Sequence, residues 1–89
     1  MVGFRKTKAA VWPNPVGNEA SLQLDLSAES LVTISVTDLQ GHSLRSLFSS
    51  ELSKGAQSIQ LPYLDLPSGE YLLLLRIGEE SSIVPFFKH

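Results

Sequence analysis

The sequence predicts an all-β domain, an antiparallel sandwich of about seven short strands. Three observations favour this fold class. Apolar and polar residues alternate over short stretches, glycine and proline separate these stretches at nearly regular spacing, and no stretch shows the helical period of about 3.6 residues. The chain has 89 residues, of which 43% are hydrophobic, so it is long enough for one domain with one core and too short for two.

Four stretches in the first two thirds of the chain have the pattern of strands. Leucines alternate with polar residues in the first, apolar β-branched residues alternate with threonine and serine in the second, and the other two are less regular or shorter. They are residues 20–26, 32–37, 43–52 and 58–61. The turn Asp38-Leu39-Gln40-Gly41 offers a glycine where positive φ is needed, so we expect the second and third stretches to pair as a hairpin.

A basic stretch precedes the first strand. We interpret residues 1–10 as a linker or N-terminal arm and residues 11–89 as the domain, and the basic lead suggests a piece of a longer protein. Residues 9–12 are an apolar run that ends at two prolines, which predicts a short edge strand followed by a rigid bend. Trp12 could serve as a ligand platform, but the only tryptophan of a small β-domain is more often buried, so we expect it in the core.

A segment in the last third combines a tight turn with the most apolar stretch of the chain. Pro67 fixes φ and Gly69 permits positive φ, so the chain can reverse before it enters residues 71–77. Tyr71 opens that strand as in the corner of immunoglobulin-like sandwiches, where a tyrosine hydroxyl bonds back to the backbone just upstream. We therefore predict an immunoglobulin-like antiparallel β-sandwich with residues 71–77 as a central strand.

Alternation along this central strand leaves two leucines on the face away from the predicted core. Leu72 and Leu74 are either covered by neighbouring elements or part of an exposed apolar patch that marks a docking or dimer face, and the sequence leaves both alternatives open. Residues 78–81 predict a hairpin turn. Residues 82–88 predict a last strand, which Pro85 confines to the edge of a sheet or to a bulge.

Charge and composition argue against several classes of function. The net charge is only −2, with seven basic and nine acidic residues scattered along the chain, so neither nucleic acid nor an anionic membrane is an expected partner. No apolar run approaches the roughly 20 residues of a membrane-spanning helix. The absence of cysteine excludes disulfides, thiolate metal sites and thiol nucleophiles.

Candidate catalytic or metal-binding residues are few. His42 and His89 have no partner at the spacing of a metal site, and we expect both in solvent. The serines lack the pattern of a nucleophile with its base and acid, and Glu79 and Glu80 fit a solvated hairpin tip better than a catalytic pair. The glycines fall singly at turns rather than in a phosphate-binding loop. We therefore expect no enzyme activity, no cofactor and no metal.

Three motifs, followed by an apolar-aromatic strand that closes on Lys88, resemble a known family. The motifs are Trp12-Pro13-Asn14-Pro15, Val36-Thr37-Asp38-Leu39-Gln40-Gly41 and Leu66-Pro67-Ser68-Gly69-Glu70-Tyr71. Each motif occurs in many β-domains. Their order, spacing and position together are similar to the C-terminal sorting domain of the type IX (Por) secretion system, over residues 11–89.

The resemblance implies which residues form the signal. They are Pro13, Asn14 and Pro15 of the opening motif, Asp38 and Gly41 of the middle motif, Gly69 and Tyr71 of the third, and Phe86, Phe87 and Lys88 of the closing strand. Two basic positions depart from the family, because His42 stands where Arg or Lys is frequent and His89 extends past the terminal lysine. The usual cleavage region would lie just before the opening motif, within or upstream of residues 1–10.

The function implied by the resemblance is a cargo signal without chemistry of its own. Such domains end outer-membrane and surface proteins of certain Gram-negative bacteria. An outer-membrane translocon and its shuttle protein recognise them, so the protein would pass from the periplasm to the outer membrane, the cell surface or the extracellular space. A sortase-like signal peptidase usually removes the domain and attaches the cargo to anionic lipopolysaccharide. Some domains in components of the machinery stay uncleaved, and these residues do not separate the two outcomes.

Two other roles fit the same residues. An apolar final strand at a sheet edge has unpaired backbone groups, so it is suited to pairing with a partner's sheet or with a second copy in a homodimer. The alternative function is a non-catalytic immunoglobulin- or fibronectin-like spacer or adhesion module, in which the motifs are only turns. A spacer should tolerate residues after His89, whereas a terminal signal should not.

Overall fold

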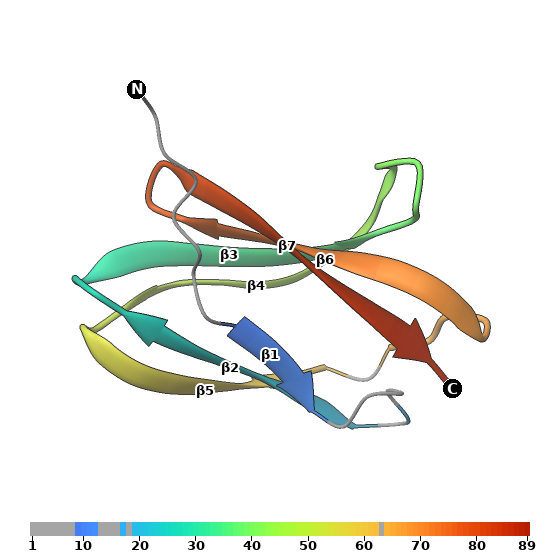
Figure 1. Ribbon diagram of the computed structural model, residues 1–89, viewed down its shortest axis with the longest axis horizontal. Coiled ribbons are helices and arrows are strands. Elements are labelled where there is room, and N and C mark those ends of the chain that lie inside the picture. Colours follow the sequence, from blue (N-terminus) through green and yellow to red (C-terminus); the bar gives the residue numbers. More distant parts are fainter. Residues whose placement is uncertain (1–8, 13–16, 18, 63) are drawn as a thin grey trace.

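Two antiparallel sheets pack face to face in the computed structural model, which describes residues 9–12, 17, 19–62 and 64–89 (Figure 1). The described part of the chain contains seven strands and no helix, which confirms the predicted all-β class. It therefore has no helix with the length and apolar character needed to span a membrane. The strands are β1 (Ala9–Trp12), β2 (Ala20–Leu26), β3 (Ser30–Thr37), β4 (Ser43–Leu52), β5 (Gly55–Leu61), β6 (Gly69–Ile77) and β7 (Glu80–Lys88).

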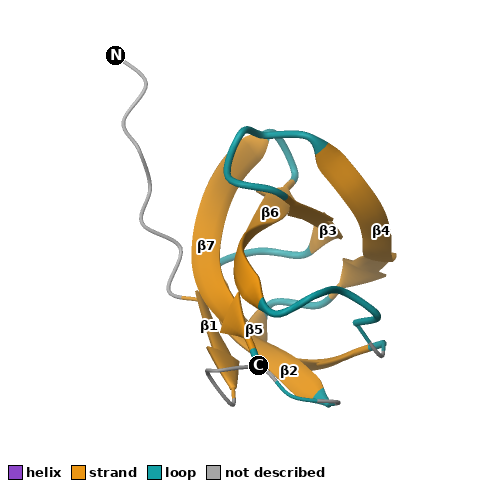
Figure 2. Ribbon diagram, turned by 90° about the vertical axis from the view of Figure 1, so that its right-hand side faces the viewer, coloured by secondary structure: helices purple, strands orange, loops and turns teal. Residues whose placement is uncertain are grey.

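The strand order is β1-β2-β5 in one sheet and β4-β3-β6-β7 in the other, which is an immunoglobulin-like arrangement. The fourth strand pairs with β3, whereas in constant-type immunoglobulin domains it joins the first sheet. β6 lies between β3 and β7, so it is central as predicted. β1 and β7 are edge strands of different sheets that approach each other along one side of the sandwich (Figure 2).

Alternation decides which side chains form the core. Strands β2, β3, β5 and β6 turn every second residue towards the opposite sheet, and each large apolar side chain buried in this way stabilises the fold by about 1.5–3 kcal/mol. The buried apolar residues are Val11, Ala20, Leu22, Leu24, Leu26, Val32, Ile34, Val36, Ile59, Leu61, Leu64, Leu73, Leu75 and Phe86.

The prediction that Trp12 lies in the core is wrong. Its side chain is 69% exposed. Val11 is the buried residue next to it, and it pairs with Leu22 on the core side of β2. Alternation therefore turns Trp12 to the outer face of the sheet, opposite Ser21. The two core-facing positions of this four-residue strand are Ala9 and Val11, so valine is the one large side chain that alternation turns inwards.

The predicted hairpins are confirmed. Gly41 has a φ of 89° in the turn between β3 and β4, as expected for the glycine of that motif. Gly78 has a φ of 60° at the first of the two residues between β6 and β7, which is the conformation of a type II′ turn. β4 is less regular than β3 because the pairing register shifts twice between them. Leu44 is consequently 45% exposed, whereas Phe48 packs against the core.

Candidate functional site

The described signal residues gather at one end of the sandwich. The β3–β4 turn with Asp38 and Gly41 follows Thr37, which pairs with Leu72 near the start of β6. β7 ends beside the start of β6, so the last residues of the chain lie at the same end (Figure 1). The positions of Pro13, Asn14 and Pro15 lie outside the described residues. The middle motif, the third motif and the closing strand, which are far apart in the sequence, are therefore held at one end by strand register, with the β3–β4 turn and the end of β7 on opposite edges of one sheet.

The predicted tyrosine corner is present at the start of β6. The hydroxyl of Tyr71 donates a hydrogen bond to the main-chain oxygen of Pro67 over 2.7 Å. Gly69 between them has a φ of 155°, in a region that L side chains rarely adopt, and a Cβ there would lie 4.0 Å from the Tyr71 ring. Proline and glycine thus shape the turn, and the hydroxyl holds it closed across four residues.

The C-terminal end of β7 is packed onto this corner. Phe86 pairs with Tyr71 and is 3% exposed, and its ring stacks on the Tyr71 ring with centroids 5.9 Å apart. Lys88 pairs with Gly69 and is only 6% exposed, with its Nζ donating to the main-chain oxygen of His89 at 3.3 Å. Two of the three predicted closing residues are therefore structural anchors that face the interior.

The third closing residue lies on the opposite face, within an apolar cluster. Ile83 is 60% and Phe87 46% exposed, and the adjoining leucines of β6 are half-buried. The cluster, here called the outer hairpin face, consists of Leu72, Leu74, Ile83, Pro85 and Phe87. The sequence left open whether the two leucines are covered or exposed. They are half-buried, because each lies beside its β7 partner on the same face.

Proline shows how the two strands of this hairpin bond. Pro85 has no N–H, so its pair with Leu72 belongs to the non-hydrogen-bonded class of antiparallel pairs. The two-residue turn of the hairpin predicts the same alternation of hydrogen-bonded and non-hydrogen-bonded pairs along the strands. By this alternation the Leu74–Ile83 pair is also non-hydrogen-bonded. Side chains of such pairs lie closer together than those of hydrogen-bonded pairs, with Cα atoms about 4.5 Å apart. The outer hairpin face is therefore a closely packed apolar surface on the last hairpin.

The middle motif is a turn locked by one carboxylate. Asp38 Oδ1 accepts hydrogen bonds from the backbone N–H groups of Gln40 and His42, both at 2.9 Å, and its Oδ2 lies 3.1 Å from Nδ1 of His42. Gly41 N donates to the main-chain oxygen of Asp38 over 3.1 Å. The backbone hydrogen bond from His42 is the largest cause that lowers the pKa of Asp38, and the ring contact adds to it.

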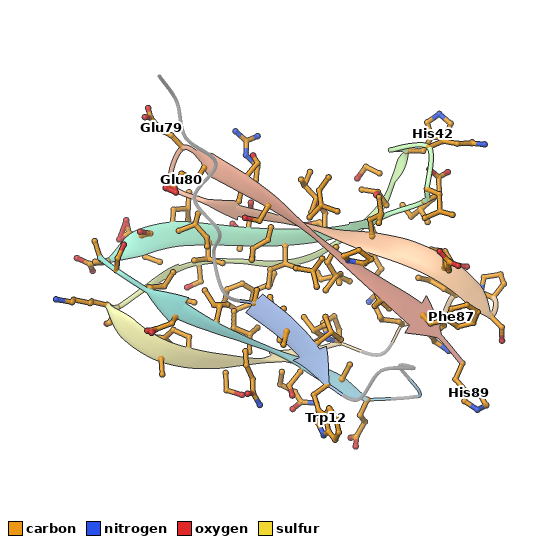
Figure 3. The ribbon with its side chains drawn as sticks, viewed as in Figure 1. Trp12, His42, Glu79, Glu80, Phe87 and His89 are labelled. Carbon is orange, nitrogen blue, oxygen red and sulfur yellow. The ribbon has the colours of Figure 1, made fainter. Side chains whose placement is uncertain are left out.

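His42 is exposed as predicted, but its contact with Asp38 was missed. The side chain is 74% exposed and projects from the end of the hairpin (Figure 3). The sequence contained a pattern that indicates such a turn. Aspartate followed three residues later by glycine favours a turn in which the carboxylate bonds to nearby backbone groups. Glu79 and Glu80, labelled in the same view, are exposed at the tip of the β6–β7 hairpin.

Shallow hollows on the described surface include the following two. One of about 460 Å³ lies over β2 and β5, and Gln23, Asp25 and Ser58 are among its lining residues. The other, of about 230 Å³, adjoins Phe87 and Lys88 at the end of the chain. The described residues hold no group of three or more metal-ligating side chains.

The two sheets and the corner define an immunoglobulin-like β-domain whose last strand is packed onto its tyrosine corner. The family model of the secretion system C-terminal sorting domain matches residues 10–87, and the chain belongs to this family. It is a C-terminal secretion signal of type IX secretion, it interacts with the secretion machinery, and it directs export to the cell surface or the extracellular space. No curated protein and no solved structure matches the chain.

Replacing Tyr71 by phenylalanine tests the corner. The ring and its stack on Phe86 are kept and only the hydroxyl is lost. We expect the free energy of unfolding to fall by about 0.5–1.5 kcal/mol, the net contribution of one hydrogen bond, because water can reach the exposed Pro67 carbonyl. Urea unfolding measures this change, with Ser68→Ala in the same turn as the control. Equal stability of Tyr71→Phe and the wild type would show that the bond does not hold the corner.

Acid unfolding tests the role of Asp38. Because its pKa is lowered in the folded state from the ordinary 3.8, its ionised form stabilises the fold. This contribution is complete above pH 3.8 and is lost as the pH falls through the lower folded pKa. We expect Asp38→Asn to lower the urea midpoint at pH 7 and to remove part of the acid sensitivity. The exposed Asp65→Asn is the control, and an equal effect of both variants would refute the locking role.

Proposed function

We propose that the secretion machinery recognises the folded domain on its outer hairpin face. The observation that supports this is the division of the closing residues. Phe86 and Lys88 are nearly buried against the corner, whereas Phe87 is 46% exposed beside Ile83 and Pro85. A receptor that binds the folded domain meets Phe87 and its apolar neighbours first, while the other two closing residues determine where Phe87 is held.

An apolar face of this kind has the composition of a docking surface. Its members are contributed by two adjacent strands and converge in closely packed pairs, and contiguous exposed apolar side chains commonly mark interaction sites. Glu70 and Arg76 lie on the same face of β6, one before and one after the leucines, so the apolar cluster has a charged residue at each end of that strand. A central apolar cluster with a polar rim is the usual anatomy of a protein interface.

Recognition through the face is favoured over pairing at the free edge of β7. Alternation turns the N–H group of Ile83 away from β6, and the next residue along β7 with this orientation is Pro85, which has no N–H. The edge of β7 away from β6 therefore lacks a donor at Pro85, which weakens strand addition by a partner or by a second copy. The outer hairpin face needs no backbone donor to bind.

The partners in this proposal are the outer-membrane translocon and its shuttle protein, which meet the domain on the periplasmic side before export. A sortase-like peptidase then cuts upstream of the domain. The domain itself contributes no catalysis. In support of this, the Asp38 carboxylate already accepts hydrogen bonds from two backbone N–H groups and contacts the His42 ring. Glu79 and Glu80 lie on an exposed tip away from the corner (Figure 3).

Export of a reporter tests the face. The full chain is fused to the C-terminus of a periplasmic reporter in a host with the type IX system, and surface delivery is measured with and without the translocon. We expect Ile83→Ser with Phe87→Ser to reduce delivery about tenfold or more, as loss of central apolar contacts weakens an interface. Leu31→Ser is the matched control, because Leu31 is 50% exposed but lies near the start of β3, outside the outer hairpin face and the three motifs.

Each outcome of this test has a meaning once the variants are shown to be folded by thermal unfolding. Reduced delivery by the double variant alone supports the proposal. Undiminished delivery, or an equal loss with Leu31→Ser, contradicts it. If sedimentation shows a wild-type dimer that the double variant dissociates while export is unchanged, the face is a self-association surface instead.

The position of β1 predicts where cleavage falls. Val11 is 7% exposed and contributes to the core from β1, so a cut within Ala9–Trp12 would remove an ordered strand. We expect mass spectrometry of the released domain to find an N-terminus at or before Ala9. A released fragment that begins after Val11 would contradict the inclusion of β1 in the cleaved domain.

A further inference from the structure

The outer face of the β1-β2-β5 sheet differs in chemistry from the outer hairpin face. Its side chains are small or polar apart from one tryptophan. The described members are Ala10 and Trp12 on β1, Ser21, Gln23 and Asp25 on β2, and Ala56, Ser58 and Gln60 on β5. The side chain of Trp12 is 69% exposed and points away from the body of the sandwich (Figure 3). The exposed indole presents a flat apolar surface and one N–H donor to solvent, which a ligand can contact.

Strand register sets the polar groups of this face beside the indole. Ser21 is the direct partner of both Trp12 and Gln60, so these three residues form a row across the sheet. Gln23, two residues along β2 on the same face, is a diagonal neighbour of Trp12 and the direct partner of Ser58. With strands about 4.8 Å apart, the row from Trp12 to Gln60 spans about 10 Å.

A hollow continues from this row along the sheet. It has a volume of about 460 Å³ and is lined by Gln23, Asp25 and Ser58 together with Leu24, Ala56 and Gln57. The hollow is open along the face, so an extended ligand can enter it without any movement of the strands.

We propose that this face binds a neutral carbohydrate, with Trp12 as the stacking platform and Gln23 and Gln60 as the main hydrogen-bonding groups. A sugar ring has an apolar C–H face that fits an exposed indole and hydroxyl groups at its rim. Each glutamine amide offers two N–H donors and an oxygen acceptor, and the serine hydroxyls both donate and accept, which matches hydroxyl groups of either role.

The charge of the face selects this ligand class over others. Its described side chains carry one charge, the carboxylate of Asp25, so phosphate or sulfate groups would be repelled. The surroundings of Trp12 are serine, alanine and glutamine rather than large apolar residues, so the face lacks the apolar cluster on which a protein interface usually centres. The site is separate from the outer hairpin face, which belongs to the other sheet.

The only tryptophan of the chain is a direct reporter of binding. The full 89-residue chain is titrated with maltopentaose, cellopentaose and chitopentaose to millimolar concentrations while indole fluorescence is followed. We expect a saturable change with at least one of them, and a fall in affinity of about tenfold or more for Gln60→Ala. Ile83→Ala, an exposed apolar residue of the other sheet, is the control and should bind as the wild type does.

Trp12→Ala is tested by backbone amide NMR, which does not depend on the indole. The sugar that shifts the amides of Ser21, Gln23 and Ser58 in the wild type should fail to shift them in Trp12→Ala, and Trp12→Phe should keep part of the effect. No response to any of the three sugars, or an unchanged affinity of Trp12→Ala, would overturn the proposal. A concentration-dependent dimer that Trp12→Ala dissociates would also overturn it and assign the face to protein contact. Reporter export should be unaffected by Gln60→Ala, because Gln60 lies outside the three motifs and the outer hairpin face, so this test and that of the outer hairpin face fail independently.

Discussion

The hydrogen bond from the Tyr71 hydroxyl to the Pro67 carbonyl is the interaction on which the arrangement of the signal depends. It closes the turn before β6 and orients the ring on which Phe86 stacks. The two-residue turn at Gly78 sets the register of β7, which turns Phe87 outwards, and the stack together with the pairing of Lys88 with Gly69 anchors the end of the strand in that register. The corner at the start of a central strand thus holds the end of β7 in the arrangement that leaves Phe87 accessible to a receptor.

Alternation made most of this fold predictable. The leucines of residues 20–26, the β-branched run of β3 and the corner at Tyr71 each combine a periodic pattern with a turn residue of known geometry, and all are found as expected. The prediction for Trp12 was wrong because it relied on the usual burial of tryptophan in small β-domains. The strand register, which decides the face that each side chain occupies, places Trp12 on the outer face. The burial of Lys88 was also beyond prediction, because a lysine at the end of a strand gives no sign of which neighbour shields it.

The candidate site was predictable as a set of residues but not as a surface. Motif order indicated which positions belong together, whereas the division of Phe86, Phe87 and Lys88 between interior and exterior follows from pairing with β6, a long-range contact that no local pattern encodes. The same holds for the Asp38 turn, where the carboxylate takes part in the backbone geometry and the histidine contact follows from it. The chain therefore carries two outer faces of opposite character, one apolar on the final hairpin and one polar around Trp12.

Amide hydrogen exchange at the chain end tests the central claim most directly. Alternation turns the N–H groups of Phe86 and Lys88 towards β6, so both amides should be protected in the wild type. In Tyr71→Ala, protection should fall at these two amides while those of β2 paired with β5 keep theirs. Unprotected amides at Phe86 and Lys88 in the wild type, or an equal loss throughout the sandwich in Tyr71→Ala, would contradict the anchoring of the signal by its corner.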